Sequence, residues 1–323
     1  MNIRSIRNPF VLAGLALLAS AAVASAQAPA KPAPAAPKAA ATGGQAFDTP
    51  QQATEALVQA ATAGDVAAVG KIFGPAGQEL VDSGDPVETK NNLAKFAEKA
   101  KAKTNVHFEL GDPNRAIVEV GDDAWPLPVP IVKSGGKWRF DVSQGKEEIL
   151  ARRIGGNELD AINLLRGYVD AQKEYAETLH DGAKVHQYAQ KWVSTAGKQD
   201  GLSWNGPDGK PAGPIGDEIA KLLAEGYTNK AEPVNGYYFR TLTAQGPNAR
   251  LGARNYIVNG AMIGGFAAIA WPAKYGSTGI QTFLVNNDGD VYQKDLGPQT
   301  STLAPAMKAY NPDKTWVVTE DEE

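Results

Sequence analysis

Between residues 47 and 155, apolar residues first recur at helical spacing and then at every second position. Asp48-Thr49-Pro50 is typical of a helix start, with a capping residue before a proline in the first turn. The apolar residues that follow keep helical spacing up to Gly64, and two shorter helical segments come after it. Alternation begins at Val106 and returns over residues 115–120. The pattern predicts helices followed by an antiparallel meander.

The stretch WPLPVPIVKSGGKWRFDV, residues 125–142, predicts a hairpin, and its three prolines favour an edge or a bulge for the first strand. We expect a helix from Lys146 to Ile154, ended by Gly155-Gly156. Helices followed by a meander form an α+β layer. The order of elements resembles the cone-shaped fold of nuclear-transport-factor-like and cystatin-like proteins. That resemblance implies a cone able to hold a small ligand.

The stretch NELDAINLLRGYVDAQKEYA, residues 157–176, predicts an amphipathic helix capped by Asn157. Its expected apolar stripe is Leu159, Ile162, Leu165, Val169 and Ala176. A short helix over residues 219–226 and five strands follow, and the NNDG turn at 286–289 joins the last two strands. We therefore expect an α+β chain with an N-terminal cone-like domain over residues 47–155. The second domain, residues 156–300, has a long helix on an antiparallel sheet, and residues 301–323 form an extension with an acidic tail.

The first 26 residues have the pattern of a secretory signal. Arg4 and Arg7 are followed by an apolar run too short for a comfortable membrane span, and Ala24-Ser25-Ala26 is a small-residue cleavage site. Residues 27–46 are rich in Ala and Pro and predict an extended linker. We expect a periplasmic or secreted bacterial protein, cleaved near Ala26, with no transmembrane segment in the mature chain.

The composition of the chain argues against several classes of function. Without Arg4 and Arg7, 30 of the 32 basic residues remain against 36 acidic ones, a net charge of −6. No basic stripe is present, so nucleic-acid binding is not expected. The absence of cysteine excludes disulfides, thiol catalysis and cysteine-ligated metals. No cofactor motif is found, since neither glycine-rich stretch is followed by Gly-Lys-Ser/Thr.

Long motifs carry a resemblance to a known family. They include WPLPVPIVKSGGKWRFD, EEILARRIGGNELDAINLLRGYVDAQKEYA, GYYFRTLTAQG, GFAAIAWPAKYGSTGIQTFLVNNDGDVYQKDLG and YNPDKTW. Over nearly all of residues 47–318 the chain resembles a bacterial exported family known only as a domain of unknown function, numbered 2950. The resemblance brings no activity with it.

The second half is also similar in pattern to the soluble heads of type IV pilins and pseudopilins. The shared features, in order, are Leu165-Arg166, Ala171-Gln172, Tyr175, Tyr188-Ala189, Gly236-Tyr237-Tyr238-Phe239, Ala270-Trp271-Pro272 and Thr278-Gly279 with Phe283, Asp288 and Gly289. The resemblance implies a helix laid on a small antiparallel sheet. The membrane-spanning segment that precedes a pilin's helix has no counterpart here, and the cone-like region stands in its place.

Three groups of residues are candidates for a site. Arg152, Arg153, Asn157 and Glu158 form a charged junction that suits either a ligand carboxylate or an ion-pair network between the domains. His180 and His186 are candidate metal ligands, although residues six positions apart do not lie on one face of a helix. Exposed aromatics of the second sheet could form an interaction surface. Its members would be Tyr237, Tyr238, Trp271, Tyr275 and Tyr292.

Two hypotheses for function remain. The first is a non-catalytic envelope protein that binds a protein partner through the pilin-like head. The alternative is a small-ligand-binding protein or an enzyme that uses the cone of the first domain. A cavity lined by polar groups favours the alternative, whereas a closed cone with an exposed apolar patch favours partner binding. The sequence names no catalytic residue and leaves the oligomeric state open.

Overall fold

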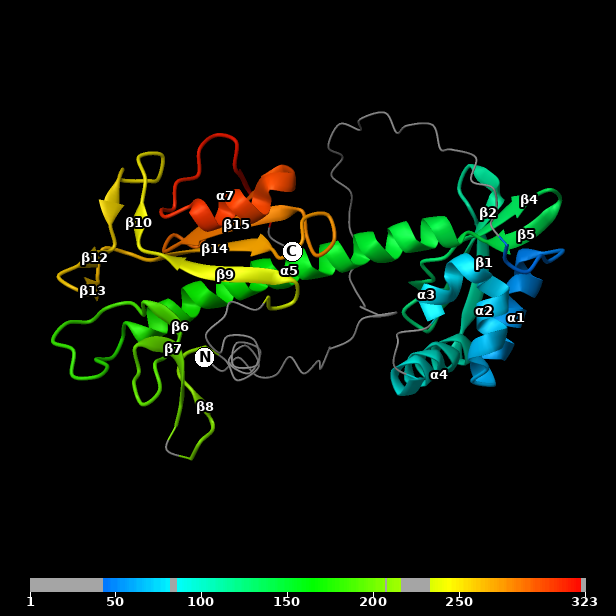
Figure 1. Ribbon diagram of the computed structural model, residues 1–323, viewed down its shortest axis with the longest axis horizontal. Helices are drawn as coiled ribbons and strands as arrows, with labels where there is room; N and C mark the ends of the chain where they lie inside the picture. The colour runs from blue at the N-terminus through cyan, green and yellow to red at the C-terminus, as the bar shows by residue number, and fades with distance from the viewer. Residues whose placement is uncertain (1–42, 82–85, 207, 216–232, 321–323) are drawn as a thin grey trace. The chain divides into compact units, whose positions relative to one another are not determined.

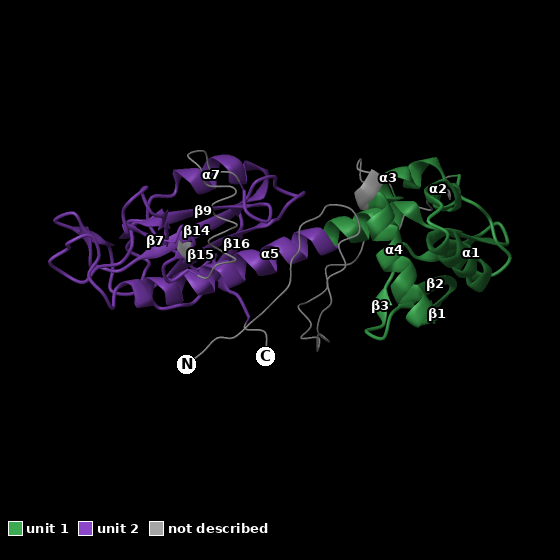
Figure 2. Ribbon diagram, turned by 90° about the horizontal axis from the view of Figure 1, so that it is seen from below, with its two compact units in different colours: residues 1–151 green, residues 152–323 purple. Residues whose placement is uncertain are grey.

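The computed structural model describes residues 43–81, 86–206, 208–215 and 233–320. The chain divides into two compact units, residues 1–151 and residues 152–323 (Figure 2). The predicted signal, most of the predicted linker and the predicted helix at 219–226 lie outside the described residues. Among the described helices, none is both long and apolar enough to cross a bilayer.

Helices open unit 1, as the sequence predicts. They are α1 (Pro50–Thr62), α2 (Val66–Phe73), the short 3-10 helix η1 (Pro75–Gly77), α3 (Gln78–Val81) and α4 (Pro86–Ala102). Thr49 is the N-cap of α1, where its hydroxyl accepts a hydrogen bond from the Gln52 amide at 3.1 Å. Asp65 caps α2 in the same way through the Ala68 amide. These side chains satisfy amides that would otherwise lack partners in the first turn.

An antiparallel sheet follows the helices of unit 1 (Figure 1). Its strands are β1 (Thr104–Glu109), β2 (Asp112–Val120), β3 (Trp125–Pro126), β4 (Ile131–Ser134) and β5 (Lys137–Phe140). They pair in the order β1-β2-β4-β5, and β3 also pairs with β2. The strand predicted from Trp125 to Lys133 is broken, because Pro128 and Pro130 cannot donate to a ladder. The α+β class expected for this part of the chain is confirmed.

Helix α5 (Val142–Tyr175) is continuous, and the expected helix end at Gly155-Gly156 is wrong. A glycine in a helix interior costs about 1 kcal/mol relative to alanine. Good helix formers surround the pair, and the packed residues that follow outweigh that cost. Asn157 therefore lies inside the helix and does not cap it.

The sheet of unit 2 has five strands in the order β17-β16-β15-β14-β9. The strands are β9 (Tyr237–Leu242), β14 (Ala267–Pro272), β15 (Gln281–Asn286), β16 (Tyr292–Asp295) and β17 (Val317–Val318). The predicted NNDG turn joins β15 and β16, with the Gly289 amide donating to the Asn286 carbonyl at 3.0 Å. Because β17 pairs with β16, the chain up to Val318 takes part in this sheet.

Smaller elements complete unit 2. They are the three-stranded sheet of β6 (Lys191–Val193), β7 (Gly201–Asn205) and β8 (Pro211–Ala212), the two-stranded pairs β10 (Ala244–Gln245) with β11 (Arg254–Asn255) and β12 (Ile257–Val258) with β13 (Ala261–Met262), the 3-10 helix η2 (Gly297–Gln299), and α7 (Thr300–Ala306).

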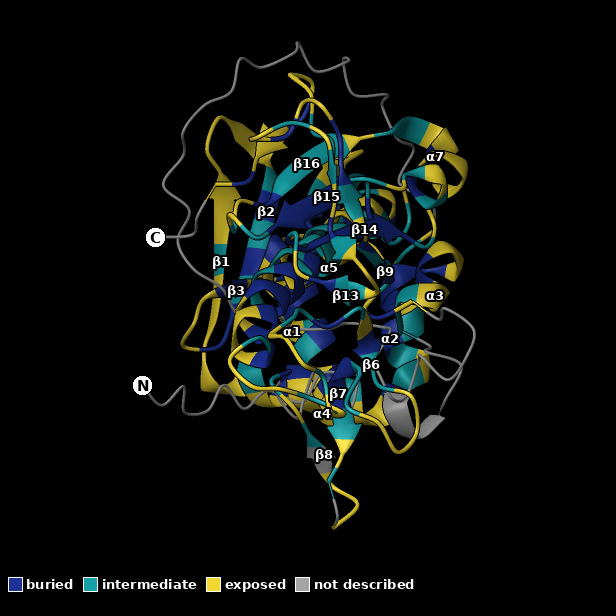
Figure 3. Ribbon diagram, turned by 90° about the vertical axis from the view of Figure 1, so that its left-hand side faces the viewer, coloured by how far each residue is buried: buried dark blue, intermediate teal, exposed yellow. Residues whose placement is uncertain are grey.

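The five-stranded sheet packs against α5 with one face and against α7 with the other (Figure 1). Tyr168 of α5 is fully buried, and its hydroxyl donates to the Ala267 carbonyl of β14. On the other face, Arg240 of β9 donates to the carbonyls of Ala304 and Pro305 at the end of α7. Figure 3 shows β14 in the buried colour, as its position between two layers requires. The pilin-like resemblance of this unit stays a prediction.

The predicted stripe of α5 is partly confirmed. Leu165 and Val169 are buried, but Leu159 is 45% exposed. The buried face also includes Tyr168 and Gln172, and the polar Gln172 is not part of a purely apolar pattern.

Candidate functional site

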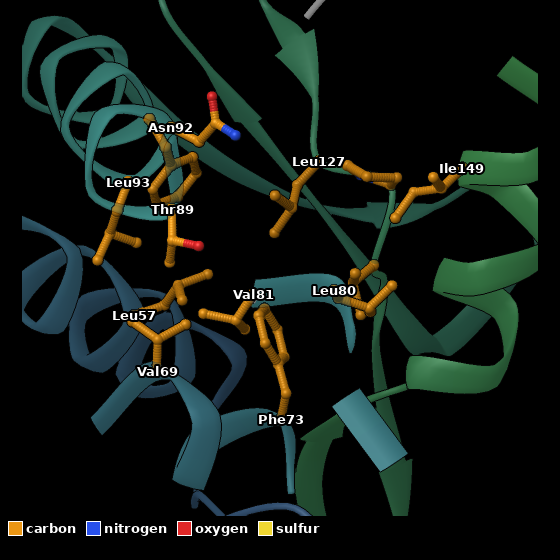
Figure 4. A pocket seen from close by; sticks show the side chains of 13 residues that line it. Leu57, Val69, Phe73, Leu80, Val81, Thr89, Asn92, Leu93, Leu127 and Ile149 are labelled. Atoms are coloured by element: carbon orange, nitrogen blue, oxygen red, sulfur yellow. The ribbon is translucent and has the colours of Figure 1, made fainter. Parts of the chain in front are cut away.

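A cavity of about 40 Å³ lies in unit 1 between the helices and the β3–β4 connection (Figure 4). Each of α1, α2, α3 and α4 contributes to its wall, and Ile149 of α5 completes it. A water molecule needs roughly 10–15 Å³. The space is therefore on the scale of a few waters or a short alkyl chain.

The wall of this cavity is almost entirely apolar. Among its apolar residues are Leu57, Val69, Phe73, Leu93, Phe96 and Leu127. Two polar side chains, Thr89 and Asn92, come from neighbouring turns of α4, and Figure 4 places them on the side opposite Leu127. Within the described part of the wall no side chain is ionisable. Such a half-open, mostly apolar space favours apolar ligand atoms.

From the sequence we expect a cone able to hold a ligand, which stays a prediction, and the sequence identifies none of the residues that line this cavity. Their signal was the apolar spacing of the helices, which is also the signal of an ordinary core. Thr89 and Asn92 could have been found as polar residues on the buried side of α4, because Leu93 and Phe96 lie next to them on the same helix.

The predicted ligand residue Glu158 instead accepts hydrogen bonds from the chain itself. Its Oε1 accepts the amides of Ile280 and Gln281 at 2.7 and 3.0 Å, where β15 begins. The Tyr237 hydroxyl lies 3.5 Å from the same oxygen and donates to the Gln281 carbonyl at 2.9 Å. Burial raises the pKa of Tyr237, and the nearby Glu158 carboxylate raises it further. The carboxylate thus fixes the sheet to α5.

Asn157 contributes to the same junction. Its side-chain amide donates to the Thr278 carbonyl at 2.9 Å. The Thr278 hydroxyl in turn donates to the Gly236 carbonyl at 2.8 Å. Gly236 has a φ of +76°, and a Cβ there would lie 2.7 Å from the Asn157 amide nitrogen. Close approach and a left-handed backbone both require glycine at this position.

The hydrogen bonds of Asn157 and Glu158 given above do not involve Arg152 or Arg153. Arg152 is half-buried and makes an interaction within the protein, whereas Arg153 is exposed. Both lie about one helical turn before Asn157 on α5. The ligand-binding role predicted for the four residues stays a prediction, and three of them, Arg152, Asn157 and Glu158, already interact within the protein.

The predicted aromatic surface is largely packed into the fold. Tyr237 is fully buried and Trp271 is 8% exposed. Trp271 contacts the Tyr238 ring in a tilted arrangement with centroids 5.6 Å apart. Tyr275 and Tyr292 are half-buried, and the Tyr275 hydroxyl donates to Asp295 at 3.2 Å. Alternation along β9 and β14 sends these rings toward α5 or α7, which is the reason that Tyr237 and Trp271 belong to the core.

The two candidate metal ligands are engaged separately. His180 stacks on Tyr175 with centroids 4.0 Å apart, and its Nδ1 lies 3.1 Å from Gln199 Oε1. His186 Nδ1 lies 2.8 Å from the Ala176 carbonyl oxygen. In the part of the chain that the structure describes, no three His, Asp or Glu side chains gather as a metal site would require.

Sequence reasoning missed one buried polar residue of unit 2. Gln172 is fully buried on α5, donates to the Tyr168 hydroxyl and the Ala189 carbonyl, and accepts the Ala189 amide at 2.8 Å. The side-chain amide of Gln172 thereby joins α5 to the segment before β6. Nothing in a helical pattern distinguishes such a residue from an exposed glutamine.

Comparison with known proteins adds the family of the chain and nothing on its activity. Neither a curated protein nor a solved structure matches the sequence. One family model does match, and it covers residues 44–319, which include most of both units. The chain belongs to the family described as protein of unknown function (DUF2950).

Proposed function

We propose that this protein is a non-catalytic binding protein that takes a small apolar molecule into the cavity of unit 1. The observation that carries the proposal is the half-open space of about 40 Å³ lined by apolar side chains of α1 to α4, the β3–β4 connection and α5. The described wall is not the polar-lined cavity that the sequence led us to expect of a ligand site. Ligand sites are also typically concave and mostly apolar with few polar groups, and this cavity has that composition.

The chemistry of the wall favours binding over catalysis. General acid–base and nucleophilic mechanisms need an ionisable or activated group within hydrogen-bond reach of the substrate. Thr89 and Asn92 are the polar side chains in the described wall, and neither has a basic group beside it there. These side chains suit recognition of a bound molecule.

Filling part of the cavity is expected to weaken binding. The chain from Gln27 should bind 1-hexanol by isothermal titration calorimetry, and Val69→Leu should weaken that binding about fourfold, because its added methylene takes the place of one CH₂ of the ligand, worth about 0.8 kcal/mol. Val69 is 2% exposed and lines the cavity. Val258→Leu, at an exposed position of unit 2, is the control. Absence of binding to the wild-type chain, or equal binding by Val69→Leu, would contradict the proposal.

A second candidate function is partner binding by unit 2 in the bacterial envelope. Export is supported by the signal pattern of residues 1–26, and an envelope protein partner by an exposed apolar face on the β12–β13 hairpin. Val258 and Ile263 are 43% and 46% exposed; Val258 ends β12, and Ile263 directly follows β13. Apolar faces that protrude in this way are frequent contact surfaces.

Crosslinking in intact cells tests both parts of this second candidate. The recovered protein should begin at Gln27, and one reproducible envelope partner should be lost in the pair of variants Val258→Asp and Ile263→Asp. Leu303→Asp is the matched control, because Leu303 is 41% exposed on α7, outside the hairpin. An intact N-terminus at Met1 would refute export. A partner retained by both hairpin variants would refute the assignment of the surface.

A further inference from the structure

We infer that the molecule bound in unit 1 is an amphiphile with a short aliphatic chain and an uncharged, hydrogen-bonding head group. This inference rests on the ligand-binding function proposed above and adds the chemical class of the ligand. It joins two features of the same wall: an apolar part, and one pair of polar side chains on α4.

The apolar part of the wall fits an alkyl chain. Leu57, Val69 and Leu93 present aliphatic groups, and Phe73 and Phe96 add the two aromatic rings of the described wall. Every CH₂ of a ligand removed from water into such surroundings contributes about 0.8 kcal/mol. The narrow volume of about 40 Å³ favours a flexible chain over a fused ring system.

Thr89 and Asn92 provide the place for the head group. They are three residues apart on α4, so their side chains lie on the same face of the helix. Thr89 is only 5% exposed, and Asn92 is half-buried. Each makes an interaction within the protein. A hydroxyl and an amide together offer several donor and acceptor positions, so they can also bind an alcohol or an amide.

A charged head group does not suit this wall. Burying a carboxylate or an ammonium without an opposite charge is far more costly than burying a neutral polar group that finds a hydrogen bond. The described wall supplies no opposite charge, since none of its side chains is ionisable. A neutral alcohol or amide is therefore preferred to an acid or an amine of the same chain length.

Four ligands with the same six-carbon chain test this preference. Calorimetric titration of the chain from Gln27 at pH 7 with 1-hexanol, hexanamide, hexanoate and hexylammonium should give affinities for the two neutral ligands at least about tenfold above those for the two ions. Hexanoate or hexylammonium binding as tightly as 1-hexanol would overturn the head-group assignment and leave the ligand-binding function standing. If none of the four binds, the ligand-binding function itself fails, and this inference fails with it.

Two substitutions locate the head group. Thr89→Val and Asn92→Leu keep the size of the side chain and should each weaken hexanamide binding about fivefold, the effect of one lost hydrogen bond of about 1 kcal/mol. Asn91→Leu is the matched control, because Asn91 is exposed on the same helix and does not line the cavity. Circular dichroism checks folding, and if one variant does not fold, the other decides. Wild-type affinity in a folded variant would refute the role given to that residue.

Discussion

Glu158→Ala is expected to lower the free energy of unfolding of unit 2 by about 3 kcal/mol, because the two amides that the carboxylate accepts lose a charged partner. Those amides belong to Ile280 and Gln281, at distances of 2.7 and 3.0 Å. Equilibrium unfolding in urea measures the change. Hydrogen exchange at the two amides should become faster than at the amides in the middle of β15.

Two further variants separate the effect of losing the Glu158 carboxylate from the effect of changing a residue of α5. Glu158→Gln keeps an acceptor oxygen at the same place and should lose about half as much stability, since only the charge is removed. Glu174→Ala changes an exposed carboxylate on the same helix and should have an effect within about 0.5 kcal/mol of zero. Stability of Glu158→Ala equal to that of Glu174→Ala would show that the junction does not depend on Glu158.

Gly279→Ala is expected to be the more damaging change and to cost more than about 3 kcal/mol, because overpacking against an immobile core group is among the most destabilising substitutions. A Cβ at residue 279 would lie 2.1 Å from the Tyr237 hydroxyl oxygen and 2.5 Å from Cζ of its ring. Tyr237 is fully buried between α5 and β15, so the ring cannot move away without breaking its bond to the Gln281 carbonyl. Thermal unfolding followed by near-ultraviolet circular dichroism measures the loss.

The neighbouring Gly276 provides the control for this clash. Its φ is +73° and a Cβ there would meet nothing within 4 Å, so Gly276→Ala should cost only about 1 kcal/mol of backbone strain. Combining Gly279→Ala with Tyr237→Ala should cost less than the sum of the two single changes, since contacting residues are not additive. Additive costs would mean that Tyr237 is not the group with which the added methyl collides.

Much of the architecture can be predicted from local pattern. Thr49 as a cap, the strand at Val106 and the NNDG turn each depend on residues close together in the chain, and each is found where expected. The alternation from Val106 onward does not bury its apolar residues, since Phe108 and Leu110 are exposed. The continuity of α5 through Gly155-Gly156 could not be read in this way. Its reason is the packing of Leu165 and Tyr168 on a sheet formed by residues about 100 positions away.

The candidate site depends still more on distant contacts. Glu158 has the composition of a ligand-binding residue, and only the fold reveals that its partners are amides 122 and 123 residues later. The cavity arises from apolar residues that each look like ordinary core. What distinguishes them is space left unfilled between six segments of the chain, and a sequence does not show such a space directly.

The central claim is that the space between the helices of unit 1 takes an apolar chain. A crystal structure of the chain from Gln27 grown with 1-hexanol tests it most directly. The account predicts alkyl density between Leu57, Phe96 and Leu127, with the hydroxyl within hydrogen-bond distance of Thr89 or Asn92. A cavity closed by side-chain rearrangement, or one that stays without ligand while 1-hexanol is bound elsewhere, would contradict it.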